Sequence, residues 1–148
     1  MTYEEFAKSN PNPYRSDVKW GEMDVLGHVN NTVFFRYFEC ARMAFWGALE
    51  TSLKGKFDPS IGPILASTSC RFRRPLYYPD NIAIGARILS IEEDRFTVEH
   101  RVWSESQQDI VAIGEGVVVS FDYEKKKKVP LPPAWKEFTE AKLRTQGS

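Results

Sequence analysis

The sequence predicts an α+β fold in which an antiparallel, five-stranded sheet wraps around one long central helix. From Thr32 onward, apolar residues recur every three or four positions, which is typical of a helix. After that segment the chain consists of β-branched runs separated by turn residues, which indicate a series of hairpin-connected strands. A helix followed by such a meander is typical of the α+β class.

The length and composition suit a single domain over residues 1–148. Hydrophobic residues make up 42% of the chain and aromatic residues 14%, enough to bury one core. Lys plus Arg and Asp plus Glu number 20 each, so there is no electrostatic basis for nucleic acid as a partner. No segment approaches the roughly 20 apolar residues that cross a bilayer, and the acidic, polar start is unlike a signal peptide. We therefore expect a cytoplasmic protein with no membrane partner.

Cys40 and Cys70 are the two cysteines of the sequence. They fit reduced, buried thiols better than a disulfide framework. The chain has no Cys-x-x-Cys pair and no cluster of histidine with cysteine, so we expect no zinc site, no other metal and no cofactor.

The segment before the long helix contains one expected strand and one expected loop. The first dozen residues, ending in the run 9–13, look irregular, and residues 14–20 can form a first strand. Residues 21–31 then form a loop interrupted by two glycines. Asn31 can serve as the N-cap of the helix, because its side chain can accept from an early backbone N–H.

The helix presents an unusually wide apolar surface. Apolar residues on both sides of its core-facing positions widen the apolar face well beyond a narrow stripe. We therefore expect other elements to surround the helix. Arg36, Glu39 and Arg42 are spaced by three and can form local ion pairs. The core-facing positions are Phe34, Phe38, Ala41, Phe45 and either Ala48 or Leu49.

Four further strands and a short C-terminal helix follow. Residues 95–104 alternate between two faces, and His100 shares one face with Phe96 and Val98, so we expect it in the core or an interface. The expected strands are residues 64–78, 82–91, 95–104 and 109–123, and the expected helix is residues 134–144.

Residues 24–31, Asp-Val-Leu-Gly-His-Val-Asn-Asn, gather polar groups where the loop meets the helix. They include an acid, a glycine, one of only two histidines and two adjacent asparagines. A loop with a helix cap would use such residues, and so would an active site built at a helix N-terminus. The residues alone leave both interpretations open.

Residues 20–42 resemble the signature of the hotdog-fold acyl-CoA thioesterases of the 4-hydroxybenzoyl-CoA thioesterase type. That signature is an aspartate, two spacers, Gly-His-Val-Asn-Asn and an aromatic-rich helix with Tyr-Phe-Glu-x-Ala-Arg, here residues 37–42. Arg-Pro-Leu-Tyr-Tyr-Pro-Asp at 74–80 and Val-Pro-Leu-Pro at 129–132 match further features in the same order. Many relatives carry Asp-Thr-Asp before the glycine, whereas here the first acid is Glu22 and the matching Asp24 remains in place.

The resemblance implies hydrolysis of an acyl- or aroyl-CoA thioester, with Asp24 as the catalytic carboxylate. Asp24 can act as a general base on water or attack the carbonyl carbon itself, and the sequence leaves both routes open. The alternative is that Asp24 only caps a turn. The resemblance also implies that the backbone N–H of Asn31 binds the thioester oxygen, at a helix end that carries unpaired donors and partial positive charge.

His28 is the second catalytic candidate. It can bind substrate, orient Asp24, protonate the leaving thiolate or simply hold the loop. Gly27 is the expected bend, and Asn30 is expected to order the loop. Gly27, Asn30 and Asn31 are therefore the predicted substrate-binding positions.

Two other catalytic arrangements are weaker. Cys40 lies more than two turns into the helix, too far along it to pair with His28. Glu39 is better explained as an ion-pair partner of its arginine neighbours. Helix carboxylates are catalytic in other hotdog branches, however, so Glu39 is the second acid to test.

Two basic segments are candidates for contact with the phosphates of coenzyme A. Lys125–Lys128 form a charge run that is typical of a solvated turn, and Arg71–Arg74 form the rival patch around a phenylalanine. No glycine-rich phosphate loop decides between them.

The resemblance also implies a homodimer or homotetramer in which each pocket combines Asp24 with strand residues of another subunit. A hydroxyacyl dehydratase of the same fold would carry a different histidine motif. A non-catalytic acyl-thioester binder would not need Asp24, and acyl carrier protein could replace coenzyme A. The sequence does not identify the acyl group.

Overall fold

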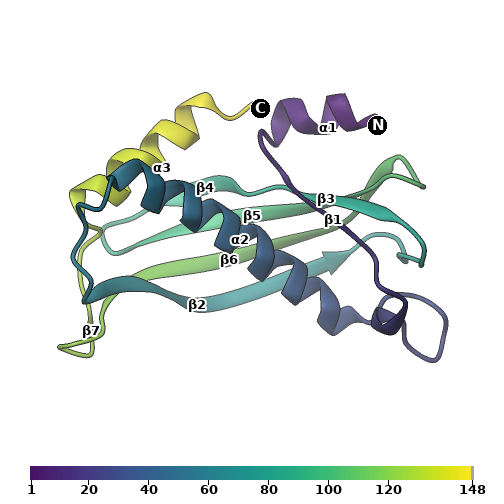
Figure 1. The fold of residues 1–148 in the computed structure, drawn as a ribbon, viewed down its shortest axis with the longest axis horizontal. Coiled ribbons are helices and arrows are strands. Elements are labelled where there is room, and N and C mark those ends of the chain that lie inside the picture. Colours follow the sequence, from purple (N-terminus) through teal and green to yellow (C-terminus); the bar gives the residue numbers. More distant parts are fainter. Residues whose placement is uncertain (148) are drawn as a thin grey trace.

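The computed structural model describes residues 1–147 (Figure 1). A short 3-10 turn at Trp20–Glu22 precedes the long helix. The helices are α1 (Tyr3–Ser9), α2 (Asn31–Leu53) and α3 (Pro133–Thr145). The strands are β1 (Tyr14–Asp17), β2 (Ile61–Phe72), β3 (Asn81–Ile84), β4 (Arg87–Ile91), β5 (Arg95–Ser104), β6 (Asp109–Asp122) and β7 (Lys127–Lys128).

The strands form one antiparallel sheet in the order β1-β3-β5-β6-β2, and α2 runs across one face of it (Figure 1). β4 pairs with β5 beyond the end of β3, and β7 pairs with β6. The predicted α+β class, with a curved antiparallel sheet around a long helix and a C-terminal helix, is confirmed. Over residues 1–147 the sheet has seven strands instead of the expected five, because the segment 82–91 divides in two and Lys127–Lys128 add a short strand. β2 ends the strand order and pairs only with β6 among the described strands.

Two strands differ in detail from the prediction. The expected strand 82–91 divides into β3 and β4, because its middle turns away from the ladder at Gly85, whose N–H donates to Arg101 O (3.0 Å). β2 ends at Phe72, before the expected residue 78. Both Arg73 and Arg74 donate their backbone N–H to Val111 O (2.8 and 3.1 Å), which interrupts regular pairing.

The prediction of an irregular N-terminus was wrong, because residues 3–9 form α1. Thr2 Oγ1 accepts from Glu5 N–H (3.1 Å), and Glu5 Oε2 accepts from Thr2 N–H (3.2 Å). This reciprocal pair is a capping box, which the Thr-x-x-Glu pattern signals in the sequence. Phe6 is fully buried and stacks against Trp103, which fastens α1 to the sheet.

The N-cap of α2 is Asn30, so the assignment of Asn31 as the cap was wrong. Asn30 Oδ1 accepts from Thr32 N–H (3.0 Å), while Asn31 is already helical and exposed. The reason is a non-local contact: Asn30 N–H donates to Glu22 O (2.9 Å), which holds Asn30 in the extended conformation that an N-cap requires.

The predicted core face of α2 is confirmed by its buried side chains. Phe38 comes closest to the sheet: a Cβ on Gly114 of β6 would lie 2.3 Å from its ring. The Phe38 ring also stacks on the ring of His100, with centroids 5.4 Å apart, and His100 is fully buried in the core. The buried positions of the helix are Phe34, Tyr37, Phe38, Ala41, Phe45, Leu49 and Leu53.

We expect Gly114→Ala to lower the free energy of unfolding by about 1–3 kcal/mol, because the new methyl group must displace the Phe38 ring in a packed core. Gly47→Ala is the matched control. A Cβ at this helical position meets nothing within 4 Å, and alanine in place of glycine should stabilise the helix by about 0.5–1 kcal/mol. Urea denaturation of both variants measures the difference, and an unchanged midpoint for Gly114→Ala would show that Phe38 is not confined.

We expect Asn30→Ala to cost about 1 kcal/mol of stability, because Thr32 N–H loses its acceptor. Asn31→Ala, one position later, removes no capping bond and should stay within about 0.5 kcal/mol of the wild type. Thermal denaturation compares the two variants. A larger loss for Asn31→Ala than for Asn30→Ala would contradict the cap described here.

Candidate active site

The loop between the 3-10 turn and α2 folds back on itself. Met23 and Val29 form an isolated antiparallel bridge. Asp24 N–H donates to His28 O (2.9 Å), and Gly27 N–H donates to Asp24 O (3.1 Å). Gly27 has φ +86°, a backbone conformation that residues with a side chain rarely adopt, so the predicted bend is present at this glycine.

Backbone hydrogen bonds fasten this loop to the rest of the protein. Val29 N–H donates to Leu76 O (2.7 Å), and Asn30 N–H donates to Glu22 O (2.9 Å). The side chain of Glu22 in turn accepts from the Tyr37 hydroxyl of α2 (2.9 Å). Burial, together with the hydrogen bond to Glu22, raises the pKa of Tyr37, so this hydroxyl remains a donor. Glu22, whose role the sequence left undetermined, thus anchors the loop to the helix.

Asp24, His28 and Asn31 line one cavity of about 320 Å³ at the N-terminus of α2, so the structure brings these three predicted residues together. Asp24 Oδ1 accepts from Leu26 N–H (2.9 Å), and Asp24 Oδ2 lies 3.9 Å from His28 Nδ1. Both side chains are partly exposed. The carboxylate is therefore held by its own loop, yet it remains accessible from the cavity.

The first turn of α2 leaves one backbone donor free. Thr32 N–H donates to Asn30 Oδ1 (3.0 Å), and Val33 N–H donates to Asn30 O (3.0 Å). Asn31 N–H forms no hydrogen bond with any residue between 1 and 147. The positive end of the helix dipole lies at the same place. A residue with an unpaired N–H and a residue with a carboxylate thus line the same cavity. These two groups are of the kinds that can polarise a carbonyl group and attack it.

Two of the predicted substrate-binding residues have structural contacts outside the cavity lining. Gly27 and Asn30 do not line the cavity. Gly27 shapes the loop, and the Asn30 side chain is occupied as the helix cap. The sequence analysis missed residues from the end of β2 and beyond that complete the cavity, among them Phe72 and Leu76. The Arg-Pro-Leu motif was visible in the sequence, but its contact with the Asp24 loop is non-local.

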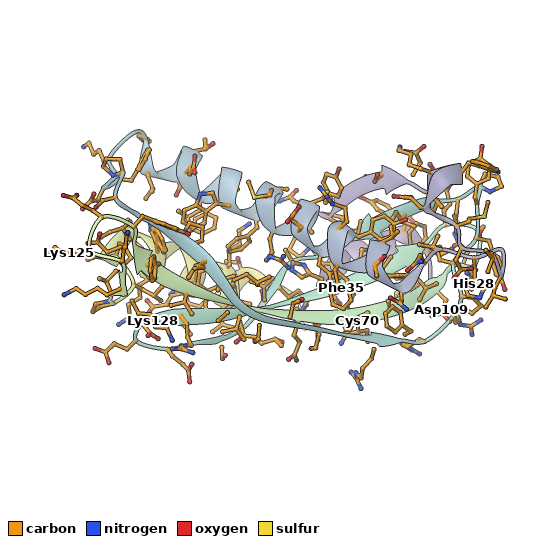
Figure 2. All side chains as sticks on the ribbon, turned by 90° about the horizontal axis from the view of Figure 1, so that it is seen from below. His28, Phe35, Cys70, Asp109, Lys125 and Lys128 are labelled. Atoms are coloured by element: carbon orange, nitrogen blue, oxygen red, sulfur yellow. The ribbon has the colours of Figure 1, made fainter. Side chains whose placement is uncertain are left out.

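The two basic segments lie at different ends of the molecule. Arg73 and Arg74 line the Asp24 cavity, and Arg74 Nε pairs with Asp109 Oδ2 (2.9 Å). The Arg73 side chain has no hydrogen bond or ion pair with the described part of the chain. Lys125 and Lys128 lie at the end of the molecule opposite His28 (Figure 2). Within one chain, only the arginine segment is therefore close to the cavity.

The alternative catalytic residues do not line this cavity. Glu39 pairs with Arg36 (3.4 Å) on the surface of α2, as the spacing predicted, whereas the predicted ion pair with Arg42 is absent from the described residues. Glu39 also lines a second cavity further along the helix. Cys40 is half-buried on α2 and, like Cys70, carries a free thiol. Across residues 1–147, no group of three or more His, Cys, Asp or Glu side chains could hold a metal ion, and no described helix is long and apolar enough to cross a membrane.

Solved structures resemble this chain over most of its length. A thioesterase of Thermus thermophilus, solved with coenzyme A and zinc, is 28% identical, with a TM-score of 0.77 over 92% of this chain and 97% of that one. A thioesterase superfamily protein of Jannaschia sp. CCS1 is 22% identical, with a TM-score of 0.79 over 100% and 96%. A 1,4-dihydroxy-2-naphthoyl-CoA thioesterase from Synechocystis is 18% identical, with a TM-score of 0.72 over 85% and 93%.

The second and third of these structures are similar in fold, which is the hotdog fold that the sequence predicted. The family is shown by the sequence itself, because residues 18–139 match the model of the thioesterase-like superfamily. The matched range includes the Asp24 loop, α2 and all strands from β2 to β7. The chain therefore belongs to the thioesterase-like superfamily.

Proposed function

We propose that the protein hydrolyses an acyl- or aroyl-CoA thioester to the free acid and coenzyme A. One observation carries the proposal: Asp24 and Asn31, whose backbone N–H has no partner in the described part of the chain, line the same cavity at the start of α2. Family membership supports the reaction class, and the Thermus relative solved with coenzyme A supports the ligand.

In this reaction the thioester oxygen accepts from Asn31 N–H, which stabilises the negative charge that develops as the carbonyl carbon is attacked. Losing one donor of this kind typically costs about 10²–10³ in rate. Asp24 takes a proton from water as the water oxygen bonds to the carbonyl carbon. The C–S bond then breaks, and coenzyme A leaves as a thiolate that takes up a proton. Alternatively, Asp24 bonds to the carbon first, the C–S bond breaks to release coenzyme A as a thiolate, and water then hydrolyses the resulting anhydride to the free acid and the Asp24 carboxylate.

We propose a supporting role for His28, which lies 3.9 Å from Asp24 Oδ2 at the mouth of the cavity. Its ring meets the edge of Tyr77, with centroids 6.3 Å apart, and this contact limits its rotation. From that position His28 can orient Asp24 or contact the thioester. Arg73, exposed and unpaired beside the same cavity, is the residue that we expect to meet a coenzyme A phosphate.

We also propose that the protein acts as a homodimer or a tetramer built from such dimers. β2 is a twelve-residue edge strand without a partner on one side, and it exposes Ile64, Leu65 and Phe72. A long apolar edge of this kind is normally covered. Antiparallel pairing of two copies of β2 would bury it and place strand residues of one copy beside the Asp24 cavity of the other.

We further propose that residues 1–148 form one thioesterase domain that acts in the cytoplasm. The family match over residues 18–139 supports the single domain. The unpaired state of Cys40 and Cys70 agrees with a reducing compartment.

We expect thiol release from at least one member of a panel of short-, medium-, long-chain and aromatic acyl-CoAs. Asp24→Asn should lower kcat/KM by about 10²–10⁴, because asparagine can neither accept the proton nor attack. Glu39→Gln, which neutralises the rival carboxylate on α2, is the matched control and should keep most of the activity. If Asp24→Asn is as fast as the wild type, the catalytic assignment is wrong. Binding of the panel without any turnover would instead identify a non-catalytic acyl-thioester binder, and acyl carrier protein thioesters would then be tested as substrates.

We expect light scattering to give a molar mass of two or four times that of one chain, because pairing is the direct way to cover β2. The measurement should be repeated over a range of protein concentrations. A monomer at every concentration would exclude a site shared between subunits.

A further inference from the structure

A cavity of about 250 Å³ lies between the second half of α2, the segment that leads into β1 and the last turns of α3. Its lining is mostly apolar and includes Ala41 and Phe45 of α2 and Ile84 of β3. Ala44 and Ala48 also line it and are exposed, so the cavity is open to solvent along α2. Sites for drug-sized ligands measure roughly 300–1,000 Å³, so this cavity suits a smaller organic molecule.

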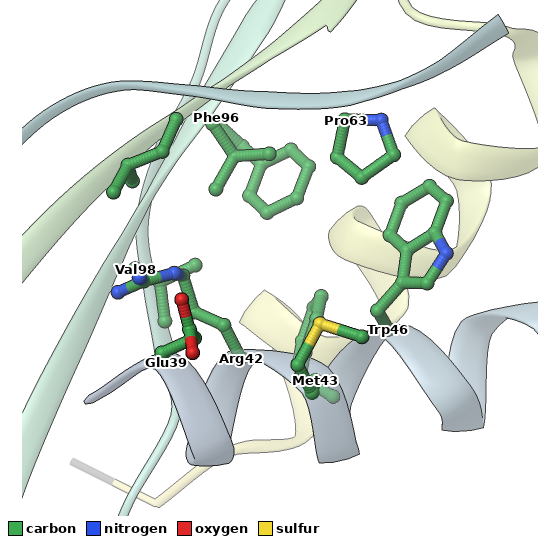
Figure 3. A pocket seen from close by; sticks show the side chains of 10 residues that line it. Glu39, Arg42, Met43, Trp46, Pro63, Phe96 and Val98 are labelled. Atoms are coloured by element: carbon green, nitrogen blue, oxygen red, sulfur yellow. The ribbon is translucent and has the colours of Figure 1, made fainter. Parts of the chain in front are cut away.

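This cavity is separate from the one at the start of α2. No residue that lines it also lines the Asp24 cavity. Ala41 follows Asn31 by ten residues, which is about 15 Å along a helix. Phe45 is shared with the cavity of about 200 Å³ further along α2, which Trp46 also lines (Figure 3). The cavity of about 250 Å³ is therefore a candidate for a second ligand and not an extension of the Asp24 cavity.

One wall of this cavity, the segment 11–14, is held in place by the residue before it. Asn10 is buried, and its Nδ2 donates to Phe6 O of α1 (3.1 Å). Asn10 Oδ1 occupies the space over Gly85, where a Cβ would lie 2.2 Å from it. The chain is therefore fastened to α1 and to the β3–β4 connection just before it reaches the cavity.

A second wall, the end of α3, is fastened to β4. The Gln146 side chain accepts from Ile88 N–H (2.9 Å) and donates to Ile88 O (2.7 Å). Gln146 N–H donates to Lys142 O (2.9 Å), and the Arg87 side chain donates to Gly147 O. Contacts outside the cavity thus fix its walls, as is usual for ligand sites that exist before the ligand binds.

Lys142 of α3 is the one charged residue among those that line this cavity, which we call the Lys142 cavity. Its side chain forms no hydrogen bond or ion pair with residues 1–147, and its Nζ lies 5.5 Å from the ring centre of Phe138. That contact leaves the three N–H donors of the ammonium group free. Asn12 and Tyr14 also line the cavity, and their side chains form no hydrogen bond with the described part of the chain. A free cation without a carboxylate in the lining suits an anion.

We propose that the Lys142 cavity binds a small organic monocarboxylate, with the carboxylate at Lys142 and the apolar body against Phe45 and the alanines of α2. The charge excludes an amine, because two cations would repel each other. The apolar walls favour a carbon chain or a ring over a small inorganic anion, since they gain only from the burial of apolar surface. The inference does not rest on the proposed thioesterase function, although the free acid that the reaction would release belongs to the same class.

Nuclear magnetic resonance tests the place of binding. Hexanoate and phenylacetate are titrated separately into full-length protein with isotope-labelled alanine methyl groups. We expect the signals of Ala44, Ala48 and Ala86 to shift, because all three residues line the Lys142 cavity. Ala66 of β2 does not line it and should not respond. If neither acid shifts these three signals at millimolar concentration, the inference is wrong.

Calorimetry tests the chemistry of binding. We expect Lys142→Met to weaken the binding of hexanoate roughly tenfold, the lower end of the effect of a hydrogen bond to a charged group, because Lys142 is half-exposed. Lys142→Arg keeps the charge and should retain binding, and Lys136→Met, an exposed lysine on the same helix, should change nothing. Hexanol, which has no charge, and acetate, which lacks most of the apolar body, should each bind at least about tenfold more weakly.

Equal binding of hexanoate to the wild type and to Lys142→Met, or equal binding of hexanol and hexanoate, would overturn the proposal. Asp24→Asn separates the two cavities, because it should leave the shifts of Ala44, Ala48 and Ala86 unchanged. If these signals move but no thioester is ever hydrolysed, the proposed function fails while the carboxylate site stands. If thioesters are hydrolysed and the signals stay still, the carboxylate site fails while the proposed function stands.

Discussion

Phe38 determines how closely α2 approaches the sheet. Its ring occupies the space above Gly114, where a side chain would come within 2.3 Å of it, and it lies flat against the ring of His100. Side chains in a close-packed interior have little freedom to shift, so this contact fixes the middle of the helix. A helix is stiff over this length, so the Asn31 amide at its start and the Arg42 guanidinium one turn beyond Phe38 are held in place as well. The positions along α2 of the cavities that Asn31 and Arg42 line therefore depend on Gly114 of β6, which has no side chain to displace Phe38.

Asp24 itself lies on a loop, and loops are normally more mobile than the elements they join. Here the loop is fastened to the same helix that supplies the amide. Asn30 N–H donates to Glu22 O, and the Glu22 side chain accepts from Tyr37 of α2. These hydrogen bonds hold the Asp24 loop in a fixed position relative to the Asn31 N–H. Groups that are already in position need no reorganisation when charge develops on a substrate, which is where electrostatic catalysis gains most.

The sequence predicted what depends on near neighbours along the chain. The period of α2, the alternation of β5 and the bend at Gly27 are local properties. The Asp24 motif pointed to the end of the helix where Asp24, His28 and Asn31 line one cavity. The first helix was also readable from its Thr-x-x-Glu capping pattern, but it was missed. The position of the N-cap at Asn30 instead of Asn31 could not be predicted from the sequence, because it depends on the hydrogen bond from Asn30 N–H to Glu22 O. The approach of Arg42 to β6 could not be predicted either, because it requires that Gly116 has no side chain: a Cβ there would lie 3.2 Å from Arg42 Nη1.

The exposed edge of β2 also bears on how the chain reaches its working form. A long row of unpaired backbone groups flanked by Ile64 and Leu65 is a template for any extended segment, including one from a partly folded copy. Pro63 and the bulge between Leu65 and Ser67 interrupt the regularity of this row near one end. Formation of the proposed dimer would therefore compete with aggregation from the moment β2 has paired with β6. The yield of folded protein at high concentration should therefore depend on how quickly the exposed edge of β2 pairs with its proper partner.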